Sequence, residues 1–565
     1  MEKVYNFIRC ATLVMLSIAF VQCDDFLDMK DRTQKSEQNF PLTENDAQQA
    51  LAGCYHIMHE NQVASFMGPT IFSDEMFGGD VPGSSPEMLY EENLNDYTIE
   101  MFSNRWPRLY KGVYRCNKLI EAIDQISFKS ETTKKQVLGE AHFMRGMYYF
   151  DLTRMYGDVP LYPTSDVSNI PRTSAAEVFA LIGSDMKKAI ELLPATPFAS
   201  ILKSDLGHAS KWAAEAMMAR VFLFYTGYYK SETLPLFEGG NVGKDEVISY
   251  LNDCIQNSGH GLVRDFRELW PYTNEYTGED YAYNKGKNLK WIGETGENKE
   301  TVFAIQFGIN GNWGLNYHND VCVFYGFPDV ADEAAIFPFG KGWGCGFVNP
   351  RIVEQWMRDE PDDVIRRSGT VFNVNDPAEG IVNPEQTIVS TKMLMTGWWQ
   401  KKYVPINVWK NKEAKTYSLY SVFTDNANDD YVFANTQDLV LIRFADVLLM
   451  HSELTQTPDG MNTVRKRAGL KPLPAYSLEA LQRERLYELF AESSRYYDLL
   501  RWYGKEAGAV IDRNQKGVEV WNCGTKDKIN FNLTERIRAT GGFLQISQKE
   551  INLSGGVLTQ TPGWQ

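Results

Sequence analysis

The chain has 565 residues, 43% of them hydrophobic, so it can bury a large core in one large or two ordinary domains. Its formal net charge at pH 7 is -16, which excludes nucleic acid as a partner, because nucleic-acid binding needs a basic surface. Aromatic residues make up 13% of the chain, and the 13 tryptophans among them are unevenly distributed.

Residues 1–22 have the features of a targeting segment. Lys3 and Arg9 give it a positively charged start, and an apolar run from Ala11 to Val21 follows. That run is too short to cross a membrane as a stable helix, so it indicates a cleaved signal peptide rather than a spanning helix. No other apolar run in the chain approaches transmembrane length.

Cys23 lies where the apolar run ends and an acidic stretch begins, as at a bacterial lipoprotein junction. Phe20 and Gln22 stand where such a junction usually carries a leucine and a small residue. We expect Cys23 to become a lipid anchor that holds the chain stably at a bilayer surface. An ordinary secretory signal is the alternative. Residues 23–40 are polar and are predicted to form an N-terminal tether.

Residues 41–258 are predicted to form a first helical block. Apolar residues recur at helical spacing over 44–60, 104–126, 141–157, 175–193 and 209–229. Thr43 is a good N-cap for the first of these helices. His56 and His59 lie on it three residues apart, near enough to share a metal ion, but no third ligand is visible and we expect no metal site. An acidic, glycine-rich loop over 73–96 contains Tyr90.

A sequence repeat lies at the centre of this block. The pattern Asp-Leu-x-Arg-x-Tyr-Gly occurs at 151–157 and again at 498–504, each time after two aromatic residues. Self-similar helical units are typical of stacked helix arrays. The residues that fall on one apolar stripe of the first copy are Ala141, Met144, Tyr148 and Leu152.

Small and charged residues of the same stretch have predicted structural roles. Gly146 permits close approach of a neighbouring helix, and Gly157 is predicted to end the helix as a C′ residue. Arg145 and Arg154 could contact a ligand, but we favour structural pairing with carboxylates between helices. The repeat is therefore interpreted as scaffold.

Residues 259–437 form a predicted loop-rich insert, and residues 438–565 a second helical block. In the insert, helical periodicity nearly vanishes, short alternating runs at 301–307 and 401–408 indicate strands, and one amphipathic helix is expected at 350–359. Helices resume at 439–453, 461–468, 478–490 and 493–503. Loop-rich inserts on a rigid scaffold commonly carry function.

Six cysteines remain after Cys10 and Cys23 are set aside, and they show no CxxC or zinc spacing. Most are expected to be buried thiols. Cys322 and Cys345 are the one pair close enough within a loop-rich region to suspect a disulfide, and whether they pair stays open.

Segments in the same order across nearly the whole chain resemble the SusD/RagB family: CDDFLD, EAHFMRGMYYFDLTRMYGDVPL, AIQFGINGNWGLNYHND, GWGCGFVNPRIVEQW, TGWWQKKY, LIRFADVLLMHSE, NTVRKRAGL, RERLYELFAESSRYYDLLRW and QTPGW. Ser547 departs from the family, which usually has proline there. The resemblance implies a mainly α fold, a tetratricopeptide-like helix-pair scaffold with a loop-rich insert containing short β-strands. It also implies a glycan-binding lipoprotein on the outer-membrane surface that acts as a lid on a SusC-like TonB-dependent transporter.

The insert holds eight of the 13 tryptophans, and this suggests where a glycan binds. Flat aromatic rings suit the C–H face of a sugar, and amide groups suit its hydroxyl rim. Trp356 is expected in the core. Trp398, Trp399 and Trp409 either pack against neighbouring strands or bind the glycan. The candidate glycan-binding residues are Tyr90, Trp270, Tyr276, Trp291, Asn312, Trp313, Tyr317 and Trp343. Each tryptophan among them either contacts ligand or only stabilises its loop.

Other function classes find less support in the sequence. There is no HExxH, GxSxG or glycine-rich phosphate loop, and the adjacent acids Asp74/Glu75 and Asp362/Asp363 have diverging side chains, so we expect no enzyme and no cofactor. Residues 425–430 resemble a calcium loop only superficially, and a structural calcium ion stays open. A binder of another nutrient class such as peptides, or a scaffolding protein without its own ligand, is the alternative.

Overall fold

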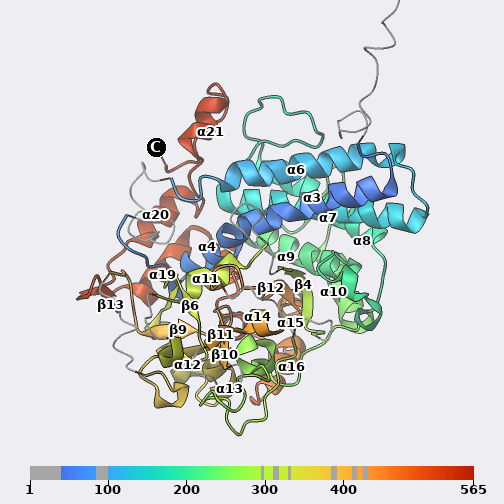
Figure 1. The fold of residues 1–565 in the computed structure, drawn as a ribbon. Coiled ribbons are helices and arrows are strands. Elements are labelled where there is room, and N and C mark those ends of the chain that lie inside the picture. The colour runs from blue at the N-terminus through green and yellow to red at the C-terminus, as the bar shows by residue number, and fades with distance from the viewer. Residues whose placement is uncertain are drawn as a thin grey trace, which may run out of the picture.

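The computed structural model describes residues 40–83, 100–293, 298–308, 317–328, 333–382, 391–409, 416–423 and 430–564. The fold is mainly helical (Figure 1), as predicted. In the first block each long helix packs against the next: α3 (Glu44–Gln62), α6 (Arg105–Ala122), α7 (Glu131–Tyr156), α8 (Ala175–Leu192), α9 (Lys211–Tyr229) and α10 (Lys244–Asn257). The last of these was not predicted from the sequence.

The second block continues this stack, because α18 packs against α9 and α15 against α10. Its helices are α15 (Phe444–Thr455), α16 (Asp459–Arg467), α17 (Leu478–Glu488), α18 (Arg495–Tyr503), α19 (Ala507–Gln515), α20 (Leu533–Thr540) and α21 (Gln548–Leu553). Among the described residues, no helix is both long and apolar enough to cross a membrane.

The insert consists of short elements joined by irregular chain. Its helices are α11 (Asp320–Tyr325), α12 (Pro350–Asp359), α13 (Val364–Thr370) and α14 (Leu419–Phe423). The antiparallel strand pairs that include insert residues are β1 (Met76–Phe77) with β7 (Phe347–Val348), β8 (Val371–Asn373) with β9 (Trp398–Gln400), β10 (Asn407–Trp409) with β11 (Thr416–Ser418), and β4 (Thr301–Ile305) with β12 (Leu439–Arg443). Strands β5 (Phe327–Pro328) and β6 (Lys341–Gly342) pair in parallel.

Outside the insert, the described strands form two antiparallel pairs, β2 (Leu234–Pro235) with β3 (Asn241–Val242) and β13 (Glu519–Asn522) with β14 (Thr525–Lys528). Helix α3 runs on into a π-helical turn, η1 (Val63–Met67), and then α4 (Gly68–Ile71). Single 3₁₀ turns are at Ile123–Gln125, Phe198–Ser200, Lys203–Asp205, Phe266–Leu269, Pro271–Thr273, Glu333–Ile336, Pro377–Glu379 and Gly504–Glu506.

Two predicted elements were wrong. Residues Leu439–Arg443 form strand β12 rather than the start of a helix, because they pair with β4, with Leu439 opposite Ile305 and Val440 opposite Ala304. A short apolar run suits either structure, and here long-range pairing decides. The strand predicted over 401–408 is also wrong for most of its length, because β9 ends at Gln400 and β10 begins at Asn407.

The predicted start of α3 and the predicted end of α7 are confirmed. Thr43 caps α3 in a capping box with Asp46. Helix α7 ends at Tyr156, and the next residue, Gly157, has a φ of 73°, in the left-handed region, and donates its N–H to Thr153 O. Arg145 of α7 makes a bidentate ion pair with Asp185 of α8, at 2.8 and 2.7 Å, which confirms its predicted structural role.

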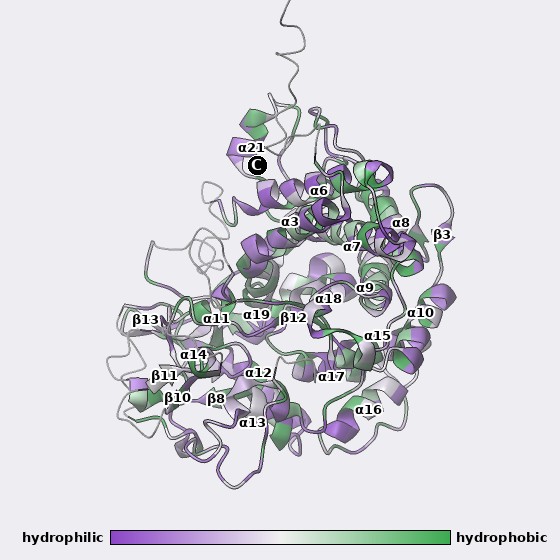
Figure 2. Ribbon diagram, turned by 45° about the vertical axis from the view of Figure 1, so that its right-hand side comes forward, coloured by the Kyte–Doolittle hydropathy of each residue, from purple (hydrophilic) through white to green (hydrophobic). Residues whose placement is uncertain are grey.

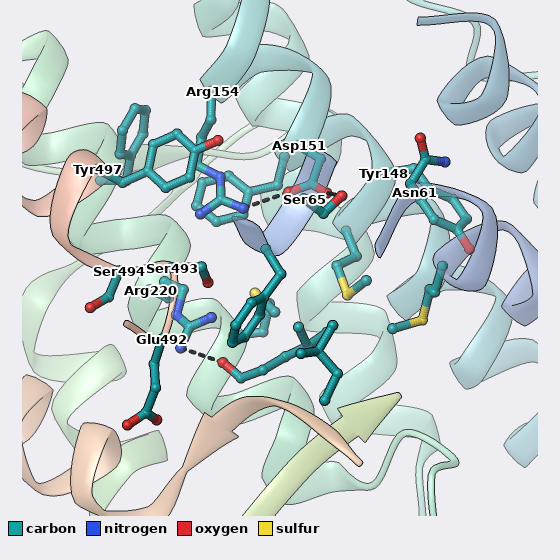
Figure 3. A pocket seen from close by; sticks show the side chains of 18 of the residues that line it. Asn61, Ser65, Tyr148, Asp151, Arg154, Arg220, Glu492, Ser493, Ser494 and Tyr497 are labelled. Carbon is teal, nitrogen blue, oxygen red and sulfur yellow. Dashed lines mark hydrogen bonds and ion pairs between the residues drawn. The ribbon is translucent and has the colours of Figure 1, made fainter. Parts of the chain in front are cut away.

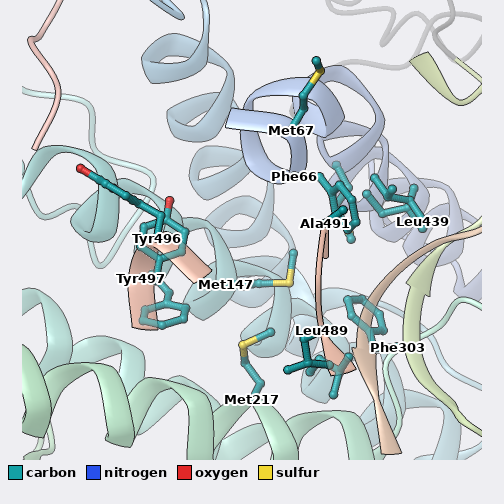
Figure 4. Close-up of a cluster of buried hydrophobic side chains, with 14 of the residues drawn as sticks. Phe66, Met67, Met147, Met217, Phe303, Leu439, Leu489, Ala491, Tyr496 and Tyr497 are labelled. Atoms are coloured by element: carbon teal, nitrogen blue, oxygen red, sulfur yellow. The ribbon is translucent and has the colours of Figure 1, made fainter. Parts of the chain in front are cut away.

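A continuous hydrophobic core joins the two blocks and the insert. Figure 2 shows both hydrophilic and hydrophobic residues on the outer helices α3 and α6, as expected of helices with one face in the core. Where α7, α9 and α18 meet β12, the core contains Met147, Met217, Leu439 and Tyr497 (Figure 4). The predicted core residue Trp356 is fully buried and stacks on Tyr487.

A buried ion network ties the insert to the second block. Arg443 contacts Glu300, Glu488 and Glu492. Arg366 of α13 reaches Glu488 from the insert. Because these charged side chains are buried away from water, each is stabilised by its ion-pair partners.

Cys322 and Cys345 are both buried and are not joined by a disulfide bond, so the suspected disulfide is not formed. Cys322 Sγ lies 3.5 Å from Gln437 Oε1, and Cys345 Sγ lies 4.0 Å from Trp343 O. Each sulfur is therefore packed into its own surroundings.

We predict that Gly146→Leu lowers the free energy of unfolding by about 1–3 kcal/mol, measured by urea or thermal unfolding. A Cβ atom at Gly146 would lie 2.6 Å from Met186 Cε and 3.2 Å from Asp185 Cβ, so a larger side chain forces α7 and α8 apart. Gly53→Leu on α3 is the control, because a Cβ there meets only Arg115 Nη1 at 4.0 Å. Equal losses in both variants would contradict the predicted close approach.

Candidate functional site

Two of the predicted tryptophans, Trp270 and Trp291, line one pocket. The pocket lies where the first block, the insert and the start of the second block meet. Its polar lining includes His208, His260, Gln306 and Asp438. The structure therefore brings together residues from three sequence regions that no local pattern connects.

Both tryptophan rings are largely covered by protein. Trp270 is 2% exposed and contacts Tyr403 edge-on with 5.6 Å between ring centroids. Trp291 is 8% exposed and contacts Tyr420 edge-on at 6.2 Å. Little of either ring is open to the pocket, so these two residues shape its wall more than they offer a stacking face.

The ionisable groups of the pocket are adjusted by burial and by their partners. Burial lowers the pKa of His260 to about 4, although a hydrogen bond with Lys299 O opposes the shift. Burial raises the pKa of Asp438 to about 7, against a hydrogen bond with Gln306. At neutral pH the His260 ring is uncharged and Asp438 is partly protonated. Such groups can donate to and accept from sugar hydroxyls.

A cluster of aromatic rings, of which Tyr317 is exposed and the others are half-buried, adjoins this pocket. Tyr317 is 39% exposed, and its ring lies edge-on to His56 and His59 of α3, with centroid distances of 5.5 and 5.7 Å. His59 also contacts Phe307 at 5.3 Å. We call these four residues the Tyr317 cluster. His59 Nε2 lies 2.8 Å from the backbone oxygen of Gln306, a residue of the pocket wall, so cluster and pocket are contiguous.

The Tyr317 cluster has the features of a sugar-stacking surface. Burial lowers the pKa of His56 and of His59 below the ordinary value, so both rings are neutral at pH 7. A hydrogen bond from Gly308 N to Tyr317 O, at 2.7 Å, fixes the backbone that carries the exposed ring. Among the described residues, no group of three His, Cys, Asp or Glu side chains could hold a metal ion.

The other predicted site residues are elsewhere or outside the described part of the chain. Trp343 is half-buried against Phe324, and its carbonyl oxygen accepts from Lys392. Tyr276 is exposed on a turn whose N–H groups bond to Asn274. The predicted residues outside the described ranges are Cys23, Tyr90, Asn312 and Trp313.

Several residues of the site were not predicted as ligand contacts. His56 and His59 were considered only for a metal, and Phe307, His208 and Asp438 were not considered. The ring centroids of His56 and Tyr317 are 5.5 Å apart, but His56 belongs to the first block and Tyr317 to the insert, and a single sequence carries no signal for such a contact.

The chain has the features of a helical-repeat binding protein. Its helix pairs form a stack that carries a loop-rich insert, and a pocket with an adjoining aromatic surface lies where the stack and the insert meet. The chain belongs to the SusD family. A family model described as "Starch-binding associating with outer membrane" matches residues 25–223, and the SusD family model matches residues 299–564.

Known relatives resemble the chain over most of its length. SusD-like protein P25 of Formosa agariphila is 23% identical over 540 residues, covering 88% of this chain and 90% of the relative. Surface glycan-binding protein A of Bacteroides fluxus superposes with a TM-score of 0.69 at 21% identity, covering 93% and 100% of the two chains. The Bacteroides thetaiotaomicron protein A, in complex with laminarihexaose, gives 0.68 at 18% identity, with 92% and 99% covered. These structural likenesses establish the fold.

Proposed function

We propose that this protein is a cell-surface lipoprotein that binds neutral glycans at the Tyr317 cluster and the adjoining pocket. The observation that carries the proposal is the exposed Tyr317 ring, which lies against His56 and His59 next to a polar pocket whose wall His59 contacts through Gln306. A sugar offers an apolar face to such a ring and hydroxyls to the pocket. Relatives of the same fold are named as glycan-binding proteins, which supports this choice of ligand.

The preference for neutral sugars follows from the charges around the cluster. His56 and His59 are uncharged at pH 7, so neither attracts an acidic sugar. His208 has a raised pKa because of its hydrogen bond with Glu140, but that carboxylate balances its charge. The nearest cation with a carboxylate partner, Lys111, is paired with Glu60, so a carboxylated sugar would compete with that pair for its charge.

We assign binding without catalysis. Two carboxylates across the scissile bond are needed to cleave a glycoside. Of the adjacent acids in the sequence, Asp74 is bound by Arg495 and Asp363 by Arg366, and both are buried. They serve as structural partners rather than as a catalytic pair.

The proposal includes anchoring and delivery. Cys23 would carry the lipid that holds the chain on the outer membrane, with residues 23–40 as a tether and residues 41–258, 259–437 and 438–565 as the three regions of the body. The bound glycan would pass to a SusC-like TonB-dependent outer-membrane transporter, which supplies the energy for import. Family membership supports both steps.

We predict that Tyr317→Ala weakens glycan binding about 5- to 150-fold, because loss of one stacked ring costs roughly 1–3 kcal/mol. The assay is isothermal titration of a chain lacking residues 1–23, with laminarihexaose as the first ligand. Tyr503→Ala is the control, because Tyr503 is 40% exposed but lies on α18. Binding lost equally in both variants, or unchanged in Tyr317→Ala, would place the site elsewhere.

A further inference from the structure

A second pocket lies in the helical scaffold (Figure 3). It is lined by both copies of the sequence repeat, with Asp151 and Arg154 from α7 and Asp498 and Arg501 from α18. The repeat thus places its charged pairs on one cavity. We propose that this pocket is a binding site for a small, neutral, hydroxyl-bearing molecule of the size of a hexose or a cyclitol.

The charges that line the pocket are compensated within the protein. Arg154 pairs with Asp151, Arg220 with Asp446, and Arg501 with both Glu453 and Asp498. The lining carboxylate Glu492 is bound by Lys402 and Arg443. A charged ligand would lose its hydration here without gaining a free counter-charge, so the pocket selects a neutral one.

Polar groups of the lining residues that lack a good hydrogen-bond partner favour a ligand with hydroxyl groups. Tyr497 is 5% exposed, and its hydroxyl has no polar neighbour of good hydrogen-bond geometry in the described chain beyond the weak interaction with Arg105 that lowers its pKa. The Nε of Arg154 is likewise buried without a hydrogen-bond partner in the described chain. Burial raises the pKa of the Tyr497 hydroxyl against the effect of nearby Arg154 and Arg105, so it stays protonated and can donate. Leaving such groups unpaired is costly, and a ligand oxygen would relieve that cost.

The rest of the lining suits the carbon frame of such a ligand. Met58, Met147, Met217 and Met450 contribute flexible side chains that adapt to irregular shapes. The Arg154 guanidinium lies 4.1 Å from the Phe150 ring centroid and 4.0 Å from that of Tyr497, which holds both in place. Ser65 and Ser493, which line the same pocket, are only partly buried and add hydroxyl groups. A polyhydroxylated ring matches this combination of apolar and polar walls.

The test compares adjacent tyrosines of α18. Tyr497→Phe removes only the hydroxyl that faces the pocket and keeps the ring beside Arg154, whereas Tyr496→Phe removes a hydroxyl that donates to Gly542 O at 2.7 Å. The probes are D-glucose, myo-inositol and, as a charged analogue, D-glucuronate, titrated by ligand-observed NMR and thermal shift. At least one neutral probe should bind wild type, and Tyr497→Phe should weaken it about 2- to 10-fold without lowering the ligand-free melting temperature.

The control should behave in the opposite way. Tyr496→Phe should lower the ligand-free melting temperature and keep wild-type affinity for the neutral probe. Glucuronate should bind more weakly than the neutral probes. The proposal is overturned if no neutral probe binds wild type at 100 mM, or if Tyr497→Phe binds the neutral probe with wild-type affinity. It is also overturned if glucuronate binds as tightly as the neutral probes. Tyr317→Ala distinguishes this pocket from the proposed glycan site, because binding here should survive that substitution.

Discussion

Replacing Glu488 by alanine should lower the free energy of unfolding by about 3–5 kcal/mol. Glu488 is fully buried and accepts hydrogen bonds from Arg443 at 2.9 Å, from Arg366 at 3.2 Å and from Arg467. Its removal leaves three guanidinium groups short of a counter-charge in a region closed to water. Urea unfolding of wild type and variant measures the difference.

A surface ion pair provides the control for this experiment. Glu238 pairs with Lys188 at 2.8 Å, but its side chain is 69% exposed. Glu238→Ala should therefore cost at most about 1 kcal/mol. If Glu488→Ala were no more destabilising than Glu238→Ala, the buried network would not stabilise the contact between insert and second block.

The charge of Glu488 also predicts how the free energy of unfolding depends on pH. Burial alone would raise the pKa of Glu488, but Arg467, Arg443 and Arg366 lower it well below the ordinary value. Its contribution to stability is thus complete above the pKa of the unfolded chain, about 4.3, and is lost as the pH falls below that value. The stability difference between wild type and Glu488→Gln should narrow as the pH is lowered from 7 to 3. A constant difference would contradict the ionised state assigned to Glu488.

Replacing Cys23 by alanine should abolish membrane attachment. The thiol of Cys23 is the expected acceptor of the lipid, and the acyl chains are the expected source of the affinity for a bilayer. Fatty-acid labelling and cell fractionation measure the effect. Cys523→Ala is the control, because Cys523 is an exposed, free thiol elsewhere on the surface and should leave labelling unchanged. Retained labelling in Cys23→Ala would show that this residue is not the anchor.

The fold was predictable where local signals decide it. Caps and stops such as Thr43 and Gly157 set the ends of α3 and α7, and the amphipathic pattern over 350–359 marked α12 correctly. The prediction failed over Leu439–Arg443, where the partner strand β4 lies far away in the sequence. Local propensity cannot reveal a distant partner.

The site was predictable in kind but not in detail. Composition indicated Trp270 and Trp291, and the structure places both on one pocket wall, but sequence alone could not show how deeply their rings are covered. The contact of Tyr317 with His56 and His59 depends on the docking of the insert against α3. Such a contact is a product of tertiary structure, so the spacing of the two histidines on one helix gave no sign of a ligand contact.

A glycan array probed with wild type and Tyr317→Ala, both lacking residues 1–23, tests the central claim most directly. The substitution removes an exposed ring and no described hydrogen bond of its side chain, so folding should be preserved. We expect wild type to bind at least one neutral glycan and to bind acidic glycans less, and Tyr317→Ala to lose most of the neutral-glycan signal. Absence of glycan binding by wild type, or an undiminished signal from a folded Tyr317→Ala protein, would contradict the account.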